Sequence, residues 1–340
     1  MNNVNLYDYF QKKALKTNSL FQVELDVTAS CNASCPFCFQ GDCHEKLDNE
    51  LSFHEIVTLL EDLRRLGTYY IGFSGGEPFT RNDFLEILRE AKKRGFRVSF
   101  ITNAMLLNES IIDELEDIGV DRITISFHSA NKDNYMRHFG IKNDLLYYKA
   151  LSNIAYLNTK NILLGFAVTV TKYNIDELDK IEEYVTSLKL SKDTINYNML
   201  LKGNSEIFSL MPTDMQIRKN NKFFFYKDSL LNKTDGKGLI CIAGKSSCSI
   251  NSIGEVFPCT FFNNNVGNIK STSIVNIWNN SHFLKIFRSI KDEHFLKCQS
   301  CSSKNKCTIC MASNINETND IFVPSESYCN SRKAKVNYND

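Results

Sequence analysis

A regular alternation of short apolar runs and amphipathic stretches over residues 21–199 constrains the fold more than any other feature of the sequence. The apolar runs have the length and composition of buried strands. Six predicted strands cover residues 21–27, 69–73, 96–101, 121–127, 162–170 and 194–199. Strands alternating with helices form a parallel sheet with right-handed crossovers. The pattern predicts an α/β protein, but periodicity alone leaves open whether the sheet forms an open barrel or is doubly wound.

The stretches between these strands carry apolar side chains at three- and four-residue spacing, which is typical of amphipathic helices. The predicted helices cover residues 52–66, 82–94, 110–118, 144–157 and 175–188. The first has the clearest boundaries, because Ser52 and Glu55 form a capping box and Gly67 ends the pattern. A further helix is expected over residues 213–226, beyond the last strand.

Polar and sulfur-bearing residues follow four of the predicted strands, each at the carboxyl end. They are Cys31, Cys35 and Cys38 after the first strand, residues 74–78 (Ser-Gly-Gly-Glu-Pro) after the second, Asn103 after the third and Ser126 at the end of the fourth. Ligands bind at this end of the strands in open barrels and in doubly wound sheets. The pattern therefore predicts one shared site.

The three thiols after the first strand, spaced C-x3-C-x2-C, form the most specific motif. They can hold three corners of a four-iron cube and leave one iron free, whereas a pure electron carrier uses four thiolates. A free iron has a use if a small molecule must bind the metal. Zinc is the alternative, because Cys43 or His44 could complete a tetrahedral site.

The 12 cysteines of this 340-residue chain fall into two groups, one ending at Cys43 and one beginning at Cys241. Grouped thiols in a chain without a secretion signal indicate metal binding or catalysis rather than disulfides. The second group lies in a loop-rich region that would need metal to fold. Its thiols make two sets of four, and two zinc sites satisfy this count as well as two iron-sulfur clusters.

The charge balance limits the partners. Forty basic and 39 acidic side chains give a net charge of +1, so no basic face for nucleic acid is expected. The N-terminus lacks the features of a signal peptide, and no apolar window approaches the length of a membrane span. We therefore expect a cytoplasmic protein that binds neither nucleic acid nor membrane.

The cysteine triplet, with Gly-Gly-Glu-Pro after the next strand, resembles the motifs of the radical S-adenosylmethionine (SAM) enzymes. The resemblance implies a partial (β/α)6 TIM-like barrel in which Cys31, Cys35 and Cys38 hold a [4Fe-4S] cluster whose free iron binds SAM. It implies SAM contacts from Phe37 (adenine), from Gly75, Gly76, Glu77 and Pro78 (amino group), from Asn103, and from Ser126 and Arg137 (ribose and carboxylate).

Two neighbouring residues complete this candidate site. His128, on the loop after the fourth strand, is the candidate catalytic residue, with a polar bystander as the alternative. Ala104 stands where the family commonly has glycine.

The second group of cysteines resembles the SPASM domain, a C-terminal extension of radical SAM enzymes that modify peptides and proteins. The resemblance assigns Cys241, Cys248, Cys259 and Cys310 to a first auxiliary [4Fe-4S] cluster, and Cys298, Cys301, Cys307 and Cys329 to a second. Some relatives leave the corner of Cys248 open for substrate. The gap between Cys307 and Cys310 is two residues where three is usual, and Cys43 is left over as a plain thiol.

The chain then divides into an N-terminal extension (1–20), a radical SAM barrel (21–200), a linker with a helix (201–240) and a SPASM domain (241–340). The resemblance implies an oxidoreductase that reductively cleaves SAM to a 5'-deoxyadenosyl radical and abstracts hydrogen from a peptide. Maturation of a ribosomally made peptide, by a crosslink or another side-chain modification, is the preferred interpretation.

The implied partners are a precursor peptide or protein and a flavodoxin- or ferredoxin-type reductant. Only residues 1–20 precede the first strand, so for a leader-bearing substrate we expect recognition by a separate leader-peptide-binding protein or by the barrel face itself. The alternatives are a haem-precursor or small-molecule radical SAM enzyme, a zinc-stapled binding protein, an electron carrier and a sulfatase-type maturase. Thr260 counts against the last, since those enzymes carry aspartate after the cysteine equivalent to Cys259.

Overall fold

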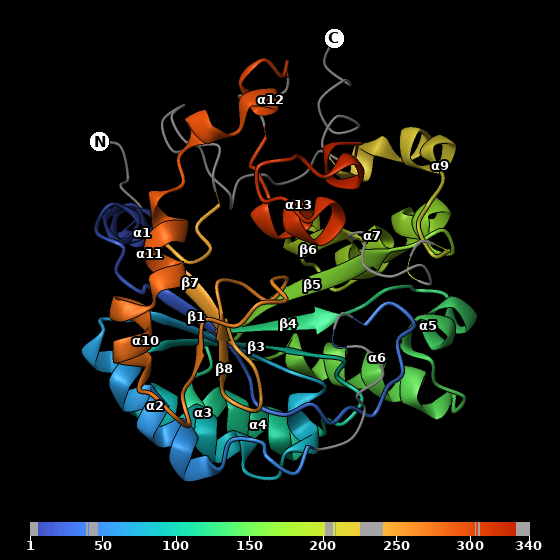
Figure 1. Ribbon diagram of the computed structural model, residues 1–340. Coiled ribbons are helices and arrows are strands. Elements are labelled where there is room, and N and C mark those ends of the chain that lie inside the picture. Colours follow the sequence, from blue (N-terminus) through green and yellow to red (C-terminus); the bar gives the residue numbers. More distant parts are fainter. Residues whose placement is uncertain are drawn as a thin grey trace, which may run out of the picture.

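The computed structural model describes residues 6–38, 40, 47–200, 207, 209–224, 241–302, 304 and 307–330. Within these residues a nine-stranded sheet has the order β6-β5-β4-β3-β2-β1-β7-β8-β9 (Figure 1). Cys43, His44 and much of the expected linker lie outside the described residues.

Six parallel strands form the predicted partial barrel. They are β1 (Gln22–Asp26), β2 (Tyr70–Ser74), β3 (Arg97–Thr102), β4 (Arg122–Ser126), β5 (Leu163–Val170) and β6 (Ile195–Met199). Each pairs in parallel with the next strand along the chain. Their carboxyl ends therefore meet at one edge of the sheet, where barrel enzymes place their active sites.

The predicted helices cover the outside of these strands (Figure 1). They are α2 (Phe53–Arg65), α3 (Phe84–Lys93), α4 (Glu109–Ile118), α6 (Leu145–Leu157) and α7 (Leu178–Ser187), the last preceded by a 3-10 turn at Ile175–Glu177. The capping box is confirmed: the backbone N–H of Glu55 donates to Ser52 Oγ (3.2 Å), and that of Ser52 donates to Glu55 Oε2 (2.8 Å).

Two helical segments differ from the sequence prediction. Helix α5 (Lys132–Phe139) follows β4, and its mostly polar sequence hides the apolar spacing that would have predicted it. The helix expected over 213–226 is shorter: α9 spans Asp214–Lys219, and a 3-10 turn at Asn221–Phe224 follows.

The barrel strands divide their side chains between two faces. Val23 and Leu25 of β1, like Ile71 and Phe73 opposite them on β2, are fully buried in the core beneath the helices. The alternate positions, including Glu24, point to the concave face, because successive side chains of a strand point in opposite directions. The concave face is thus free to carry polar side chains.

The C-terminal region continues this sheet. Strand β7 (Ser247–Ile250) pairs in parallel with β1, and β8 (Glu255–Phe257) and β9 (Gly267–Asn268) extend the sheet in antiparallel fashion. Helix α10 (Ile274–Asn280) packs against α2, and α11 (His282–Ser289), α12 (Leu296–Gln299) and α13 (Met311–Thr318) follow (Figure 1). A second apolar cluster, which includes Phe262, Phe287, Phe295 and Met311, forms the core of this region.

The N-terminal helix α1 (Leu6–Thr17) is joined to the far end of the chain. The indole N–H of Trp278 in α10 donates to the carbonyl oxygen of Asn18 at 2.9 Å. Among the described residues, no helix combines the length and the apolar character that crossing a membrane requires.

Candidate active site

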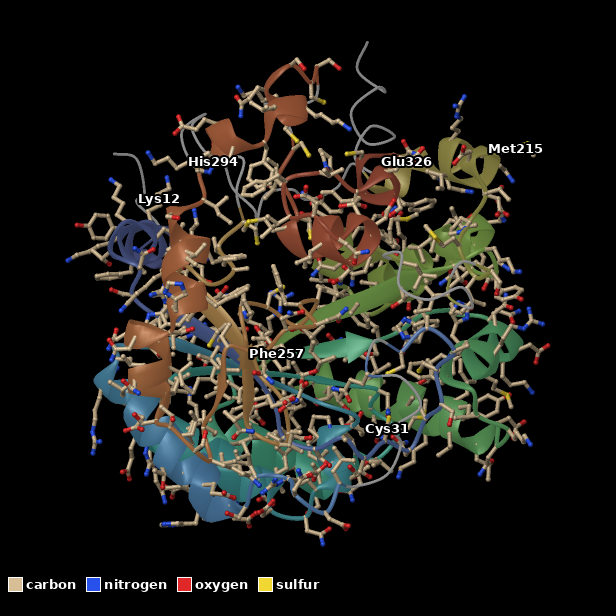
Figure 2. The ribbon with its side chains drawn as sticks, viewed as in Figure 1. Lys12, Cys31, Met215, Phe257, His294 and Glu326 are labelled. Atoms are coloured by element: carbon tan, nitrogen blue, oxygen red, sulfur yellow. The ribbon has the colours of Figure 1, made fainter. Side chains whose placement is uncertain are left out.

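The loop that follows β1 carries the cysteine triplet at the carboxyl end of the sheet, and Figure 2 labels Cys31 on it. Burial raises the pKa of Cys31 to about 11. The pKa of Cys35 also lies well above its usual range, first because of burial and then because the charges of Cys38 and Cys31 oppose its ionisation. The three thiols therefore lie within electrostatic range of one another. Cys31 and Cys35 are sheltered enough that a bound cation would be needed to keep them deprotonated.

Four later segments hold this cluster loop, which we define as residues 27–38. The carboxylate of Glu50 accepts from the backbone N–H of Ala29 (2.6 Å) and from Thr28 Oγ1 (3.1 Å). On the far side, the backbone N–H of Ser34 donates to the carbonyl oxygen of Phe139 (2.8 Å), at the end of α5. The loop is thus fixed at both ends before any ligand binds.

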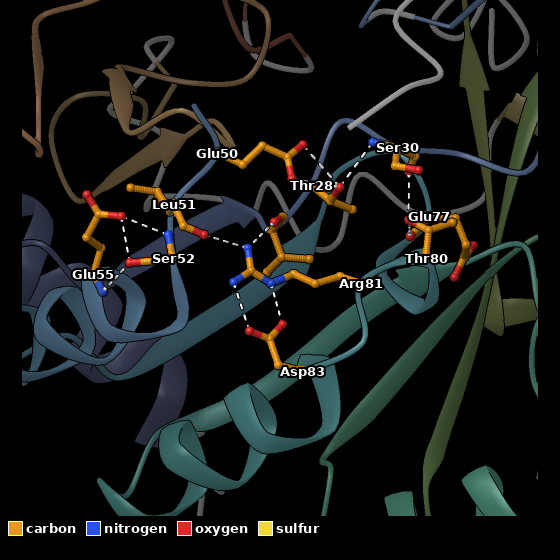
Figure 3. Close-up of polar contacts among 11 residues, drawn as sticks. Thr28, Ser30, Glu50, Leu51, Ser52, Glu55, Glu77, Thr80, Arg81 and Asp83 are labelled. Carbon is orange, nitrogen blue, oxygen red and sulfur yellow. Dashed lines mark hydrogen bonds and ion pairs between the residues drawn. The ribbon is translucent and has the colours of Figure 1, made fainter. Parts of the chain in front are cut away.

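Arg81 also supports the start of the cluster loop (Figure 3). Its Nη1 donates to the carbonyl oxygens of Val27 (2.8 Å) and Leu51 (2.7 Å). Asp83 accepts from Arg81 Nε at 2.6 Å and orients the guanidinium. The guanidinium of Arg81 thereby joins two chain segments.

Gly75 and Gly76 bring the second loop directly onto the cluster loop. The backbone N–H of Gly76 donates to the carbonyl oxygen of Thr28 (2.8 Å). A Cβ atom on Gly76 would overlap the carbonyl oxygen of Ser30, and one on Gly75 would overlap that of Thr28. Gly75 also has φ +134°, which side chains rarely adopt. The pair is therefore required for the approach of two backbones.

Glu77 links three of the predicted site segments. Its backbone N–H donates to the carbonyl oxygen of Ser30 (2.8 Å). Its buried carboxylate accepts from Thr102 Oγ1 (2.7 Å) and from the backbone N–H of Asn103 (2.8 Å). Asn103 in turn donates from Nδ2 to Oδ1 of Asn32 in the cluster loop (2.8 Å). Burial raises the pKa of Glu77 to about 7. The structure thus brings the cysteine loop, Gly-Gly-Glu-Pro and Asn103 together.

Phe37 and His128 also meet, although they come from different loops. The Phe37 ring packs edge-on against the His128 ring, with centroids 5.2 Å apart, and His128 stacks on Phe139 at 4.8 Å. The Nδ1 atom of His128 accepts from the backbone N–H of Thr169 (3.1 Å). Burial lowers the pKa of His128 to about 3, so the imidazole is neutral at physiological pH.

Ser126 and Arg137 have different surroundings. Ser126 ends β4 on the concave face, opposite Ala167 of β5. Arg137 lies on α5 with an exposed side chain, and its guanidinium stacks over the Tyr173 ring at 4.7 Å. The structure thus shows an aromatic partner for Arg137. The role of Arg137 as a SAM ligand remains a prediction.

The buried hydroxyl of Tyr135 supports the presence of a cluster beside Cys35. Within the part of the chain that the structure describes, this hydroxyl, on α5, has no hydrogen-bond partner, although the residue is fully buried. Burial, followed by the charge on Cys35, raises the pKa of Tyr135. A buried hydroxyl normally finds a partner, and the sulfur atoms of an iron-sulfur cluster would supply acceptors. The residues present fit the implied group.

Sequence reasoning missed two carboxylates on the concave face of β1, Glu24 and Asp26. Glu24 lies across Gly72 of β2 so closely that a Cβ there would overlap its carboxylate, and Asp26 accepts from Gln40 Nε2 at 3.1 Å. Both side chains keep some accessible surface, yet burial by the surrounding protein raises the pKa of each to about 7. The negative charge of Asp26 raises the pKa of Glu24 further. Their alternation with Val23 and Leu25 is the signal that could have revealed them.

The C-terminal thiols form two groups. Burial and then the charges of Cys241 and Cys310 raise the pKa of Cys259 to about 12. Burial and then the charges of Cys329 and Cys301 raise the pKa of Cys298. Cys307 follows Cys301 on the same connection, with its Sγ 3.7 Å from the carbonyl oxygen of Thr308. Cys248 lies on β7 and is buried in the main apolar core.

These features define a class: a partial α/β barrel that presents three thiols at the carboxyl end of its sheet, followed by a second thiol-rich region on the same sheet. Residues 25–185 match the radical SAM superfamily, and residues 241–308 match SPASM, an iron-sulfur cluster-binding domain. The chain is a radical SAM enzyme with a SPASM domain. This assignment decides against the zinc-stapled and electron-carrier alternatives.

The chain is similar to known proteins over most of its length, by sequence and by structure. The AdoMet-dependent heme synthase of Methanosarcina barkeri is 26% identical, with 94% of this chain and 99% of the relative covered. Streptococcus suis SuiB bound to S-adenosylmethionine superposes with a TM-score of 0.74 at 16% identity, covering 97% of this chain and 84% of SuiB. Native anSMEcpe with bound AdoMet superposes with a TM-score of 0.70 at 17% identity, covering 93% of this chain and 96% of anSMEcpe. At these identities the structural likeness concerns the fold.

Proposed function

We propose that the chain abstracts a hydrogen atom from a peptide and thereby matures a ribosomally made precursor. When bound, the N-terminal cluster and SAM supply the 5'-deoxyadenosyl radical for this step. Cys31, Cys35 and Cys38 hold the cluster, and the Gly75–Pro78 segment borders the SAM site. Phe37, Asn103, Ser126 and Arg137 complete the proposed SAM contacts.

The chemistry of the concave face carries this proposal. Glu24 and Asp26 line it on β1, and the hydroxyls of Tyr70 and Ser99 form a hydrogen bond across β2 and β3. Such a face offers acceptors to the amide and cationic groups of a peptide. Amide and cationic groups lose their water partners when they are buried, so they need hydrogen-bond acceptors of the protein in their place. SuiB bound to the precursor peptide SuiA, which shares the fold, is consistent with the proposal.

His128 is proposed to position Phe37 rather than to transfer a proton. Its imidazole is neutral, and its Nδ1 already accepts a backbone N–H. A general base works best with a pKa near the operating pH, and the pKa of this histidine is about 3. The ring contact with Phe37 is the interaction through which it would act.

A haem-forming reaction is the second candidate, because the curated relative from Methanosarcina barkeri is matched over nearly its whole length. The carboxylates of β1 argue against it, although Arg122 of β4 supplies a cation on the same face. Haem and its tetrapyrrole precursors carry ionised carboxylates, which Glu24 and Asp26 would repel wherever either is charged. The amide groups of a peptide carry no charge and meet no such repulsion.

The experiment supplies both substrate classes to anaerobically reconstituted enzyme with SAM and dithionite. Formation of 5'-deoxyadenosine tests the family chemistry, and Cys35→Ala should abolish it. A mass change in a peptide encoded beside the gene supports the proposal. Conversion of an iron tetrapyrrole, with every such peptide unchanged, would overturn it in favour of the second candidate.

A further inference from the structure

We infer that Arg122 selects the substrate: its guanidinium receives one carboxylate of the substrate on the concave face, and Glu24 faces a cationic or amide group beside it. The carboxylate belongs to an acidic side chain or to the C-terminus of a peptide. This inference rests on the proposed function and deepens it, because it names the charge that the modified peptide must carry.

Arg122 and Glu24 lie in one row of paired residues across the barrel sheet. Glu24 of β1 pairs with Gly72 of β2. Ser99 of β3 pairs with Gly72 on one side and with Arg122 of β4 on the other. Paired residues of neighbouring strands point to the same face of a sheet. This face is the concave one, since Ile123, the residue after Arg122, is fully buried in the main core.

Each of the two charged side chains reaches across a glycine of a neighbouring strand. A Cβ atom on Gly165 of β5 would overlap the guanidinium of Arg122, and one on Gly72 would overlap the carboxylate of Glu24. Gly165 pairs with Thr124, which follows Arg122 by two residues on β4. The guanidinium of Arg122 therefore lies nearer the carboxyl end of the sheet than its own Cα atom does, on the side of the proposed SAM site.

Neither charged side chain has a partner of its own in the part of the chain that the structure describes. There, the guanidinium of Arg122 and the carboxylate of Glu24 make no hydrogen bond and no ion pair, although both residues are half-buried. Arg97, on the neighbouring strand, is by contrast paired with Asp121 at 2.9 Å. Taking a charge out of water without supplying a partner is unfavourable. The unpaired guanidinium thus points to a ligand, and a carboxylate matches its planar donors in two parallel hydrogen bonds.

Tyr70 and Ser99 lie between the two charges. Their hydroxyls form a hydrogen bond across β2 and β3, between Glu24 on β1 and Arg122 on β4. Burial raises the pKa of Tyr70, and after this hydrogen bond the charges of Glu24 and Arg122 act on it in opposite directions. The concave face thus has a cationic side, a neutral centre and an acidic side, to which Asp26 also belongs.

This arrangement of charges discriminates among substrates that carry carboxylates. One guanidinium neutralises one carboxylate, and a second carboxylate would meet the acidic side formed by Glu24 and Asp26. A peptide with one acidic group at Arg122 and with amide or basic groups toward Glu24 satisfies both sides. An iron tetrapyrrole brings more than one carboxylate to the same face, so the row favours the peptide.

The test measures binding to the full chain, anaerobically reconstituted and loaded with SAM, with no reductant present. The probe is a random hexapeptide library, made once with free and once with amidated C-termini, and retained peptides are sequenced by mass spectrometry. We expect peptides with one carboxylate to be enriched about tenfold or more over their uncharged amide counterparts. Enrichment in both pools assigns the carboxylate to a side chain, and enrichment in the free pool alone assigns it to the C-terminus.

Arg122→Gln should abolish this enrichment, and Arg122→Glu should replace it with enrichment of lysine- and arginine-bearing peptides. Glu24→Gln should admit peptides with a second carboxylate. Arg97→Gln is the matched control, because Arg97 already has Asp121 as its partner. Arg122 has no partner to lose among the described residues, so both of its variants are expected to fold, which circular dichroism checks. The same acidic enrichment in folded Arg122→Gln, or none in the parent, would overturn the inference.

Failure of this inference and failure of the proposed function are seen separately, because the library measures binding without turnover. A peptide that binds through Arg122 and stays unmodified under reducing conditions would count against the proposed function and leave this inference standing. Modification of a peptide with equal efficiency by the parent and by Arg122→Gln would do the reverse.

Discussion

Tyr135 shows how one unsatisfied group can identify the neighbour that it requires. Its hydroxyl is buried within electrostatic range of Cys35 and has no hydrogen-bond partner among the described residues. Leaving such a group unpaired costs about 1–3 kcal/mol. A hydrogen bond to the cluster would recover this cost and would stabilise the more negative, reduced state.

Removing this hydroxyl should therefore lower the reduction potential of the N-terminal cluster. For Tyr135→Phe we expect a decrease on the order of tens of millivolts, because hydrogen bonds to cluster sulfurs raise the potential. A redox titration followed by electron paramagnetic resonance measures it. Tyr197→Phe is the matched control, since its buried hydroxyl is also unpaired but senses Glu182 and Asp179 rather than a thiol. Equal shifts in the two variants would contradict the assignment.

Glu24 gives a pH dependence of stability. Burial raises its pKa in the folded protein from the usual 4.5 to about 7, so the folded state binds the proton more tightly than the unfolded state does. Stability is then greatest below about pH 4.5 and falls as the pH rises through about 7. Glu24→Gln should abolish this loss.

We expect Glu24→Gln to raise the free energy of unfolding at pH 8 by on the order of 1–2 kcal/mol, with little effect at pH 4. The apparent Tm at the two pH values measures the difference. A variant equally stabilised at both would show that the carboxylate is not protonated in the folded state. Glu86→Gln, on the exposed side of α3, is the control.

At the scale of elements, the site depends on loops that approach one another more closely than side chains permit. Gly76 contacts the cluster loop at the carbonyl oxygen of Ser30, and Gly140, which ends α5 with φ +60°, packs against Ser34. Two different connections thus position the same loop. The glycines act on the spacing between backbones, in addition to any contact with SAM.

Gly76→Ala should disrupt the N-terminal cluster without unfolding the chain, because the added methyl group pushes the second loop away from residues 28–30. We expect loss of about four iron atoms per chain, with the helical circular dichroism retained. Gly67→Ala is the control: Gly67 has φ +80° but open space around its Cβ, so it should cost about 1 kcal/mol of strain and leave the iron content unchanged. Full iron in Gly76→Ala would show that the loop accommodates the methyl group.

At the scale of the whole molecule, the C-terminal region completes the barrel sheet. β7 covers the edge of β1, and the main core includes Ile250, Val256, Trp278 and Leu284. Burying each such side chain contributes about 1.5–3 kcal/mol. The sum is comparable to the entire stability of a typical domain, which is about 5–15 kcal/mol.

A chain ending at residue 240 should therefore fail to fold on its own, although the predicted barrel boundary lies before that point. Its β1 would be an unpaired edge strand above an open core, which favours aggregation. Circular dichroism and size-exclusion chromatography of the truncated chain provide the measurement. A soluble monomer with cooperative unfolding would contradict this and would show that residues 21–200 form an independent domain.

The sequence by itself determined the features that depend on neighbours along the chain. Helical spacing and the Ser52 capping box located α2, and the strand runs located six parallel strands in order, because period and capping are local properties. The same order placed the cysteine triplet and Gly-Gly-Glu-Pro at one edge of the sheet. Helix α5 was missed because its few buried residues lie in a polar sequence.

Only the tertiary structure decided which distant segments pair and which face each side chain takes. The pairing of β7 with β1 joins residues more than two hundred positions apart, and it turns Cys248 toward the main apolar core. It also set Glu24 and Asp26 on the concave face. Spacing along a chain counts the residues between two thiols, but their separation in space depends on sheet register and packing.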